Sequence, residues 1–180
     1  SDRGLCGGFN ANIVRKSLNV MEEYGTMEYG VMAVGRKGRD QMRRHEKPIF
    51  SEYVNMFREL EFAHAQQIAG RIIKMFLERE LDKIDIVYNE FKSAVQQNVI
   101  VEQLLPIQGI EMNESKSQID YVYEPEREVL LDTLLPRHLN IQIWRVLLES
   151  FAAEQGARMT AMENATDNAD EMIHKLTLLY

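Results

Sequence analysis

Three closely spaced glycines near the start of the chain are the first feature that could take part in chemistry. Gly4, Gly7 and Gly8 lie in the segment Arg3–Asn10, here called the glycine corner, just before a helical pattern. Glycine permits backbone angles closed to other residues, and free N–H groups at a helix start can bind a phosphate. However, the spacing is neither G-x-G-x-x-G nor G-x-x-x-x-G-K-S/T. We therefore expect a tight strand-to-helix corner rather than a nucleotide site.

A run of basic residues is a second candidate for phosphate binding. Its members are Arg36, Lys37, Arg39, Arg43 and Arg44. Most runs of this kind are solvated helix faces, and we expect one here. No acidic residue ends the preceding strand as a ribose ligand would, because Gly35 stands there. A small Rossmann-like nucleotide- or phosphate-binding enzyme stays open as an alternative, on the glycine corner alone.

The other polar residues form no catalytic or metal-binding pattern. There is no Ser/His/Asp set, no Cys/His pair with supporting context and no pair of carboxylates distinguishable from surface charge. The single cysteine, Cys6, excludes an internal disulfide and favours a reducing compartment. The histidines are scattered without ligand spacing: His45, His64, His138 and His174. We expect no catalytic site, metal or cofactor in this chain.

Charge and hydropathy narrow the possible partners of the 180-residue chain. Its net charge of -7 argues against general nucleic-acid binding. Residues 1–50 carry nine basic and six acidic side chains, whereas 111–132 carry two and seven, which suits a part with different neighbours at its two ends. No run approaches 18 apolar residues, so we expect no membrane span. The opening at Ser1, without Met or an apolar run, is expected of a fragment or a processed product.

The glycine corner and the basic run must be positioned by a mixed set of helices and strands. Apolar periodicity predicts helices at 9–23 (capped by Asn10 or Asn12), 36–45 and 54–80, strands at 29–34, 84–88, 99–105 and 121–123, and a polar loop at 108–118. This order predicts the α/β class, with a Rossmann-like layered domain and parallel strand pairing in its first part. The later strands follow each other too closely for a crossover helix, so we expect an antiparallel edge.

A long C-terminal helix follows, and we divide the chain into an α/β base domain at 1–125 and this helix at 126–180. Pro125 suits its first turn and Pro136 predicts a kink or a restart. The part after Pro136 would run roughly 65 Å at 1.5 Å per residue, whereas a compact domain of this size is about 40 Å across. The helix is therefore expected to protrude.

The long helix carries an apolar stripe, here called the seam, at alternating spacings of four and three. It consists of Trp144, Leu148, Phe151, Gln155, Arg158, Met162, Ala165, Ala169, Met172, Leu176 and Leu179. This is the 3.5-residue period of a left-handed coiled coil, which needs a facing helix. Packing back onto the sheet is an alternative only for the part from Trp144 to Phe151. We expect the partner to be a segment outside this chain or another chain.

Three segments resemble one known family. Ser1-Asp-Arg-Gly-Leu-Cys-Gly-Gly-Phe-Asn-Ala-Asn12 resembles the corner after the first strand of the gamma subunit of F-type ATP synthases. Ala157-Arg-Met-Thr-Ala-Met-Glu-Asn-Ala-Thr-Asp-Asn-Ala169 resembles that family's C-terminal signature, and Tyr121-Val-Tyr-Glu-Pro125 with Leu130-Leu-Asp-Thr-Leu-Leu135 is similar to it as well. The order and separation also match, so the resemblance covers essentially the whole chain.

The resemblance implies a mechanical role in a proton-transporting synthase. Such a subunit is the central-stalk rotor, whose long helix forms an antiparallel coiled coil with an N-terminal helix that this chain lacks. It turns inside the catalytic alpha and beta subunits, and its base meets the epsilon subunit and the membrane c-ring. The implied location is peripheral to the energy-transducing membrane, on the cytoplasmic (bacterial) or matrix side. No catalysis of its own and no insertion into the membrane are implied.

The resemblance also implies roles for single residues. Glu154 and Arg158 match places that face the contact loops of the catalytic head, and Cys6 lies near the same zone. Tyr121, Tyr123 and Glu124 match the base that meets the c-ring and the epsilon subunit. The seam positions Phe151, Met162, Met172, Leu176 and Leu179 would pack on the N-terminal helix. The inserted cysteine pair of some photosynthetic members is missing, so we predict no thiol switch.

Overall fold

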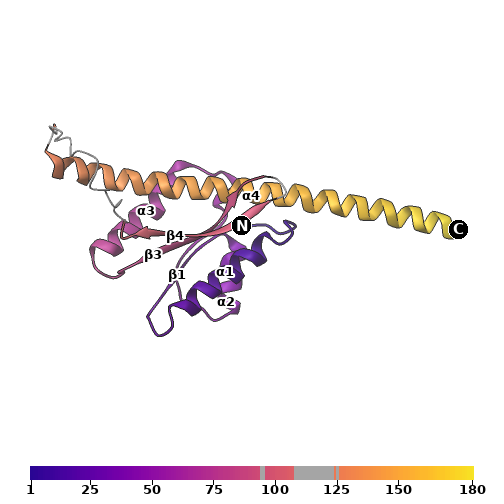
Figure 1. Ribbon diagram of the computed structural model, residues 1–180, viewed down its shortest axis with the longest axis horizontal. Helices are drawn as coiled ribbons and strands as arrows, with labels where there is room; N and C mark the ends of the chain where they lie inside the picture. Colours follow the sequence, from indigo (N-terminus) through magenta and orange to yellow (C-terminus); the bar gives the residue numbers. More distant parts are fainter. Residues whose placement is uncertain (94–95, 108–123, 125) are drawn as a thin grey trace, which may run out of the picture. The chain divides into compact units, whose positions relative to one another are not determined.

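Figure 1 shows the computed structural model of the chain, which describes residues 1–93, 96–107, 124 and 126–180. The elements in order are α1 (Phe9–Glu23), β1 (Val31–Val34), α2 (Arg36–Arg44), β2 (Ile49–Tyr53), a 3-10 turn η1 (Met56–Arg58), α3 (Phe62–Leu77), β3 (Ile84–Phe91), β4 (Gln97–Leu105) and α4 (Arg127–Leu179). The mixed strands and helices and the long C-terminal helix confirm the predicted fold class.

The chain divides into two compact units. The first contains Ser1–Leu60, Val87–Ile100 and Val146–Tyr180, and the second contains Glu61–Ile86 and Val101–Arg145. The strands β3 and β4 and the helix α4 therefore contribute residues to both units. The division at residue 125, which separates a base domain from a helix, follows element types rather than compactness and stays a prediction.

In the first unit, β1 and β2 pair in parallel, with Val31 opposite Ile49 and Val34 opposite Tyr53. Parallel neighbours need a crossover, and α2 provides it, which confirms the expected parallel pairing in the first part of the chain. The strand β2 was not predicted. Its alternating intermediate and exposed side chains lack the continuous apolar run by which β1 was recognised.

The predicted helix at 54–80 is wrong in its first turns. Asn55 has a positive φ of 65°, which ends β2 and prevents a helix from starting there. Only the short turn η1 follows, and α3 begins at Phe62. The N–H of Glu61 donates to Nδ1 of His64 at 3.1 Å, so a side chain in the first turn fixes the helix start.

The helix α1 spans the predicted residues, but its predicted cap is wrong. The N-cap is Gly8 and makes no side-chain cap bond. The N–H of Phe9 instead donates to the Cys6 carbonyl at 3.1 Å, and the regular helical bonds begin with Asn12, which donates to Gly8 at 2.9 Å. Asn10 lies inside the helix and points back at the glycine corner.

The second sheet consists of β3 and β4, which extend further than the predicted strands. Only residues 92–96 join them, and a parallel crossover needs a dozen or more residues, so the pair is antiparallel. The predicted loop at 108–118, the strand at 121–123 and Pro125 lie outside the described residues. Among the described helices, none combines the length and apolar composition that a membrane span requires.

In the second unit, the first half of α4 is held by α3 and β4. The rings of Phe62 and Trp144 meet edge to face with centroids 5.8 Å apart. Arg145 donates from Nη2 to both carboxylate oxygens of Glu102, at 2.9 and 2.7 Å. Pro136 lies within this half, and α4 continues through it, so the predicted restart does not occur.

Gly35, between β1 and α2, is a position where the backbone excludes other residues. Its φ is 96°, and a Cβ there would lie 2.9 Å from the backbone of Ser1. We predict that Gly35→Ala lowers the free energy of unfolding by about 2–4 kcal/mol, through strain and a backbone clash. Urea denaturation would measure it. Gly38→Ala, three residues on with open space around it, is the matched control and should be neutral or stabilising. Equal effects of the two changes would contradict the argument.

Candidate functional site

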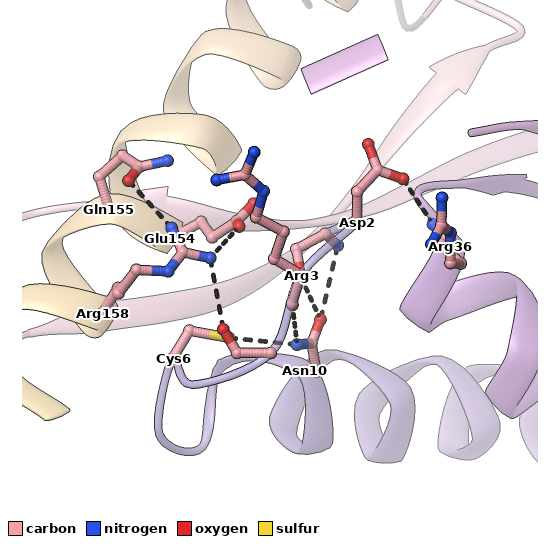
Figure 2. A network of polar contacts seen from close by, with 10 residues as sticks. Asp2, Arg3, Cys6, Asn10, Arg36, Glu154, Gln155 and Arg158 are labelled. Atoms are coloured by element: carbon pink, nitrogen blue, oxygen red, sulfur yellow. Dashed lines mark hydrogen bonds and ion pairs between the residues drawn. The ribbon is translucent and has the colours of Figure 1, made fainter. Parts of the chain in front are cut away.

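The residues singled out at the glycine corner and on α4 meet within the first unit. Figure 2 shows the corner lying between the start of α2 on one side and the middle of α4 on the other. Polar contacts extend on both sides of it, from Arg36 and Asp2 to Glu154, Gln155 and Arg158. This group of contacts is the candidate functional site.

Asp2 fastens one side of the corner to the strand ends. Its Oδ1 accepts the backbone N–H of Arg36 and that of Asn55, both at 2.9 Å. The carbonyl of Ser1 accepts the N–H of Lys37 at 2.9 Å. The side chain of Arg36 donates to Oδ1 of Asn55 at 2.6 Å. The start of α2 is therefore satisfied by the chain itself.

The other side of the corner packs on α4 through small side chains. Cys6 and Phe9 form a buried cluster with Ala153 and Ala157. Gly7, at a φ of 52°, is so close to the helix that an added Cβ would lie 3.9 Å from the Ala161 Cβ. Alanine at 153, 157 and 161 repeats every four residues and so lines one face of α4. This face lets the corner backbone approach the helix.

Arg158 completes the contact with α4. Its Nη2 donates to Oε1 of Glu154 at 2.5 Å and lies 3.5 Å from the carbonyl oxygen of Gly4, while Nη1 donates to Gln155 at 2.9 Å. The residue Glu154 is only 4% exposed, so the pair is largely withdrawn from water. Removing the charged partner of a buried carboxylate is costly, because the remaining charge is left uncompensated.

Asn10 and Cys6 join the two sides of the corner. The Asn10 amide donates to the Cys6 sulfur at 3.1 Å and to the Arg3 carbonyl at 3.4 Å, and its oxygen accepts from the Ser1 hydroxyl at 2.9 Å. Cys6 is 2% exposed. Its thiol therefore lies inside the corner rather than on a surface that another protein could contact directly.

The phosphate interpretation of the corner finds little support in these contacts. At the two helix starts, Phe9 donates its N–H to the Cys6 carbonyl, Arg36 donates to Asp2 and Lys37 donates to the Ser1 carbonyl, so these three N–H groups are engaged within the chain. Within the part of the chain that the structure describes, no group of three or more His, Cys, Asp or Glu residues could hold a metal. What the structure shows at the corner is close packing and hydrogen bonds within the chain.

Two members of the basic run on α2 pair with acidic side chains. Arg39 pairs with Asp40 at 2.7 Å, and Arg43 pairs with Glu52 at 2.7 Å. The hydrogen bonds that Arg39 donates to the Asp40 carboxylate lower the pKa of Asp40 and raise the pKa of Arg39. Arg36, Lys37, Arg43 and Arg44 are exposed, which confirms the predicted solvated helix face.

The structure brings together Cys6, Glu154 and Arg158, which were predicted as one contact zone. Only Arg158 is partly exposed; the other two are buried. Glu124 is exposed, whereas Tyr121 and Tyr123 lie outside the described residues. These assignments stay predictions. Sequence reasoning missed Asp2 and Asn10, because their partners are set by the fold: Asp2 bonds residues 34 and 53 positions away.

The seam divides into a covered and an uncovered part. Phe151 stacks on Phe57 with centroids 6.2 Å apart and 2° between the rings, so the alternative of packing back onto the domain holds for this position. Every residue from 162 to 180 is exposed. Among the apolar seam positions, Met162 is 43% and Met172 64% exposed, and Leu176 and Leu179 are exposed as well. The coiled-coil role of these residues stays a prediction.

Known proteins resemble the chain over its whole length. The model of the ATP synthase family matches residues 1–180. The ATP synthase gamma chain of Chlorobaculum parvum is 46% identical, and that of Anaeromyxobacter sp. is 47% identical; each match covers 100% of this chain and 63% of the relative. The chain belongs to the ATP synthase family and spans about 63% of the length of these gamma-chain relatives.

A solved structure agrees with this assignment. A chain in the cryo-EM structure of the central stalk and c-ring of the Tetrahymena thermophila mitochondrial ATP synthase has a TM-score of 0.74 and 29% identity. The match covers 92% of this chain and 73% of that one. A rotor chain of the Euglena gracilis mitochondrial enzyme, at a TM-score of 0.69 and 19% identity, shares the fold.

The buried pair on α4 leads to a stability prediction. Arg158→Ala should lower the free energy of unfolding by about 1–3 kcal/mol, because it leaves Glu154 buried without its charged partner. The matched control is Lys175→Ala, which breaks the exposed pair Lys175–Glu171 at the same i,i+4 spacing and should cost at most about 0.5 kcal/mol. Chemical denaturation of both variants measures the difference, and equal losses would show that burial of Glu154 is irrelevant.

Proposed function

We propose that this chain is the core of the central-stalk rotor subunit of a proton-transporting F-type ATP synthase, and that it catalyses no reaction by itself. The observation that carries the proposal is α4: a 53-residue helix whose last third is exposed, in a chain matched throughout by the ATP synthase family. The likeness to a central-stalk chain in a complex with a c-ring supports it.

The long helix α4 would act as a shaft that makes the catalytic sites unequal. As α4 turns, each catalytic subunit meets a different face of it, so shaft angle biases the equilibrium between open and closed sites. The proposed contact is made by Arg158, with Gln155 beside it, because Cys6 and Glu154 are buried within the chain. Partly exposed ion pairs contribute only about 0–1 kcal/mol each, which suits contacts that are broken at every step.

The base would connect this shaft to the ion-driven ring. By family resemblance, Tyr121, Tyr123 and Glu124 contact the c-ring and the epsilon subunit, and the subunit lies peripheral to the membrane on the cytoplasmic or matrix side. Catalytic alpha and beta subunits surround the upper part of α4, and the seam pairs with an N-terminal helix of the full-length subunit. The alternative of a small nucleotide-binding enzyme is not favoured, because the N–H groups of Phe9, Arg36 and Lys37 at the helix starts are bonded within the chain and the ATP synthase family matches the whole chain.

The proposal predicts which proteins co-purify with the full-length subunit. Affinity capture of the native protein from membranes, followed by mass spectrometry, should recover the nucleotide-binding catalytic subunits and a small accessory subunit. An unrelated membrane complex captured under the same conditions is the control for integrity. Clean recovery of the subunit alone, while that control remains whole, would refute the rotor proposal.

The seam gives a second prediction for the full-length protein. Met162→Asp should prevent assembly or uncouple rotation from hydrolysis, because it places an unpaired charge in a helix interface at a cost of about 3 kcal/mol or more. Met159, also exposed, flanks the seam at a position where coiled coils carry charges. Met159→Asp is therefore the matched control. A Met162→Asp complex that assembles and couples like the control would show that the seam has been misplaced.

A further inference from the structure

Asp2, directly before the glycine corner, is an acidic side chain that the proposed function leaves without a role. A single oxygen, Oδ1, accepts two backbone N–H groups, from Arg36 and from Asn55, each at 2.9 Å. The first N–H begins α2 directly after β1, and the second belongs to the left-handed residue that follows β2. One carboxylate therefore ties the corner to the carboxyl ends of both parallel strands.

Neighbouring contacts make this attachment rigid. Gly35 donates its N–H to the Tyr53 carbonyl at 2.7 Å, which joins the ends of β1 and β2, and Lys37 donates to the Ser1 carbonyl at 2.9 Å. Arg36 spans the same place by donating to the Asn55 side chain at 2.6 Å. Asp2 lies at the centre of these bonds, and charge-assisted bonds to a carboxylate are about twice as strong as neutral ones.

The same short segment meets α4 a few residues later. Gly4 lies beside Arg158, Cys6 is buried against Ala153 and Ala157, and Gly7 approaches Ala161. A displacement of the corner would therefore move the surroundings of Arg158 directly. The route from the strand ends to Arg158 runs through Asp2, the corner backbone and Gly4, all within the first unit.

We propose that Asp2 is a positioning residue of the rotor: it fixes the glycine corner on the strand ends and thereby sets the angle at which α4 presents Arg158 and Gln155 to a catalytic subunit. This inference rests on the proposed function. Asp2 itself touches no partner; it acts through the corner and Arg158. Substitution of Asp2 should therefore loosen the corner and weaken the contact between Arg158 and a catalytic subunit, while leaving the seam intact.

The test uses the full-length subunit assembled in its synthase and two measurements. Cys6 reports on the corner, because its thiol is buried there beside Asn10. In Asp2→Ala the rate of Cys6 alkylation by N-ethylmaleimide, located by peptide mass spectrometry, should rise about tenfold, as expected for two lost hydrogen bonds. ATP turnover of the assembled complex should fall about fivefold, the lower end of coupling between sites.

A double-mutant cycle separates positioning from general destabilisation. If Asp2 acts through Arg158, Asp2→Ala combined with Arg158→Ala turns over no more slowly than Arg158→Ala alone, whereas independent effects would multiply. The matched control is Asp40→Asn, which changes an exposed carboxylate on α2 that pairs with its neighbour Arg39; it should change neither measurement. If Asp2→Ala does not assemble, Asp2→Asn takes its place, since it keeps an oxygen acceptor and loses the charge.

The outcomes distinguish this inference from the proposed function. Faster Cys6 labelling together with a non-additive cycle supports the positioning role. Unchanged labelling, or turnover losses that multiply, overturns it even where the subunit still purifies with the catalytic subunits. Absence of those subunits from the wild-type preparation overturns the proposed function itself, before any variant is compared.

Discussion

The close approach of the corner backbone to α4 is the constraint on which the candidate site depends. Glycine at position 7 and alanine at 153, 157 and 161 keep the side chains between the two segments small, and Cys6 and Phe9 pack directly on Ala153 and Ala157. Dispersion forces act only at such contact distances, and small residues on both sides allow them. Arg158 can reach the Gly4 carbonyl only because the backbone is this near. A larger residue at 157 would part the segments and remove the polar contact with them.

The buried pair beside this contact contributes more to specificity than to stability. Taking the Glu154 carboxylate out of water costs several kcal/mol, which Arg158 offsets only while the geometry is held. An apolar pair of similar volume could give an equally stable helix. The charged pair, however, fixes one rotation of α4 against the corner. If the helix rotated about its axis, the carboxylate would be left without a charged partner among Cys6, Phe9 and the alanines. A shaft that must hold one angle benefits from such a contact.

The sequence predicted the elements with strong periodicity and failed where tertiary contacts decide. The helix at 9–23, the basic helix and the seam follow from spacing alone. The strand β2 was not predicted, because its residues alternate only weakly in burial. The helix at 54–80 was predicted too long, because the spacing of apolar residues does not reveal the positive φ at Asn55. Cys6, Glu154 and Arg158 were grouped by family resemblance, but the burial of two of them and the bonds of Asp2 arise from residues far apart in sequence.

The two faces of α4 explain how one helix can belong to a domain and extend beyond it. Up to Ala157 one face is buried by the chain, and the adjacent seam begins on the neighbouring face with Phe151 already packed on Phe57. From position 162 onward no residue of the helix is covered. A lone helix of that length is marginal in water, and exposed Met and Leu side chains favour association. In the proposed coiled coil, a facing helix would stabilise the free end of α4, while the corner contact would set the angle of the helix.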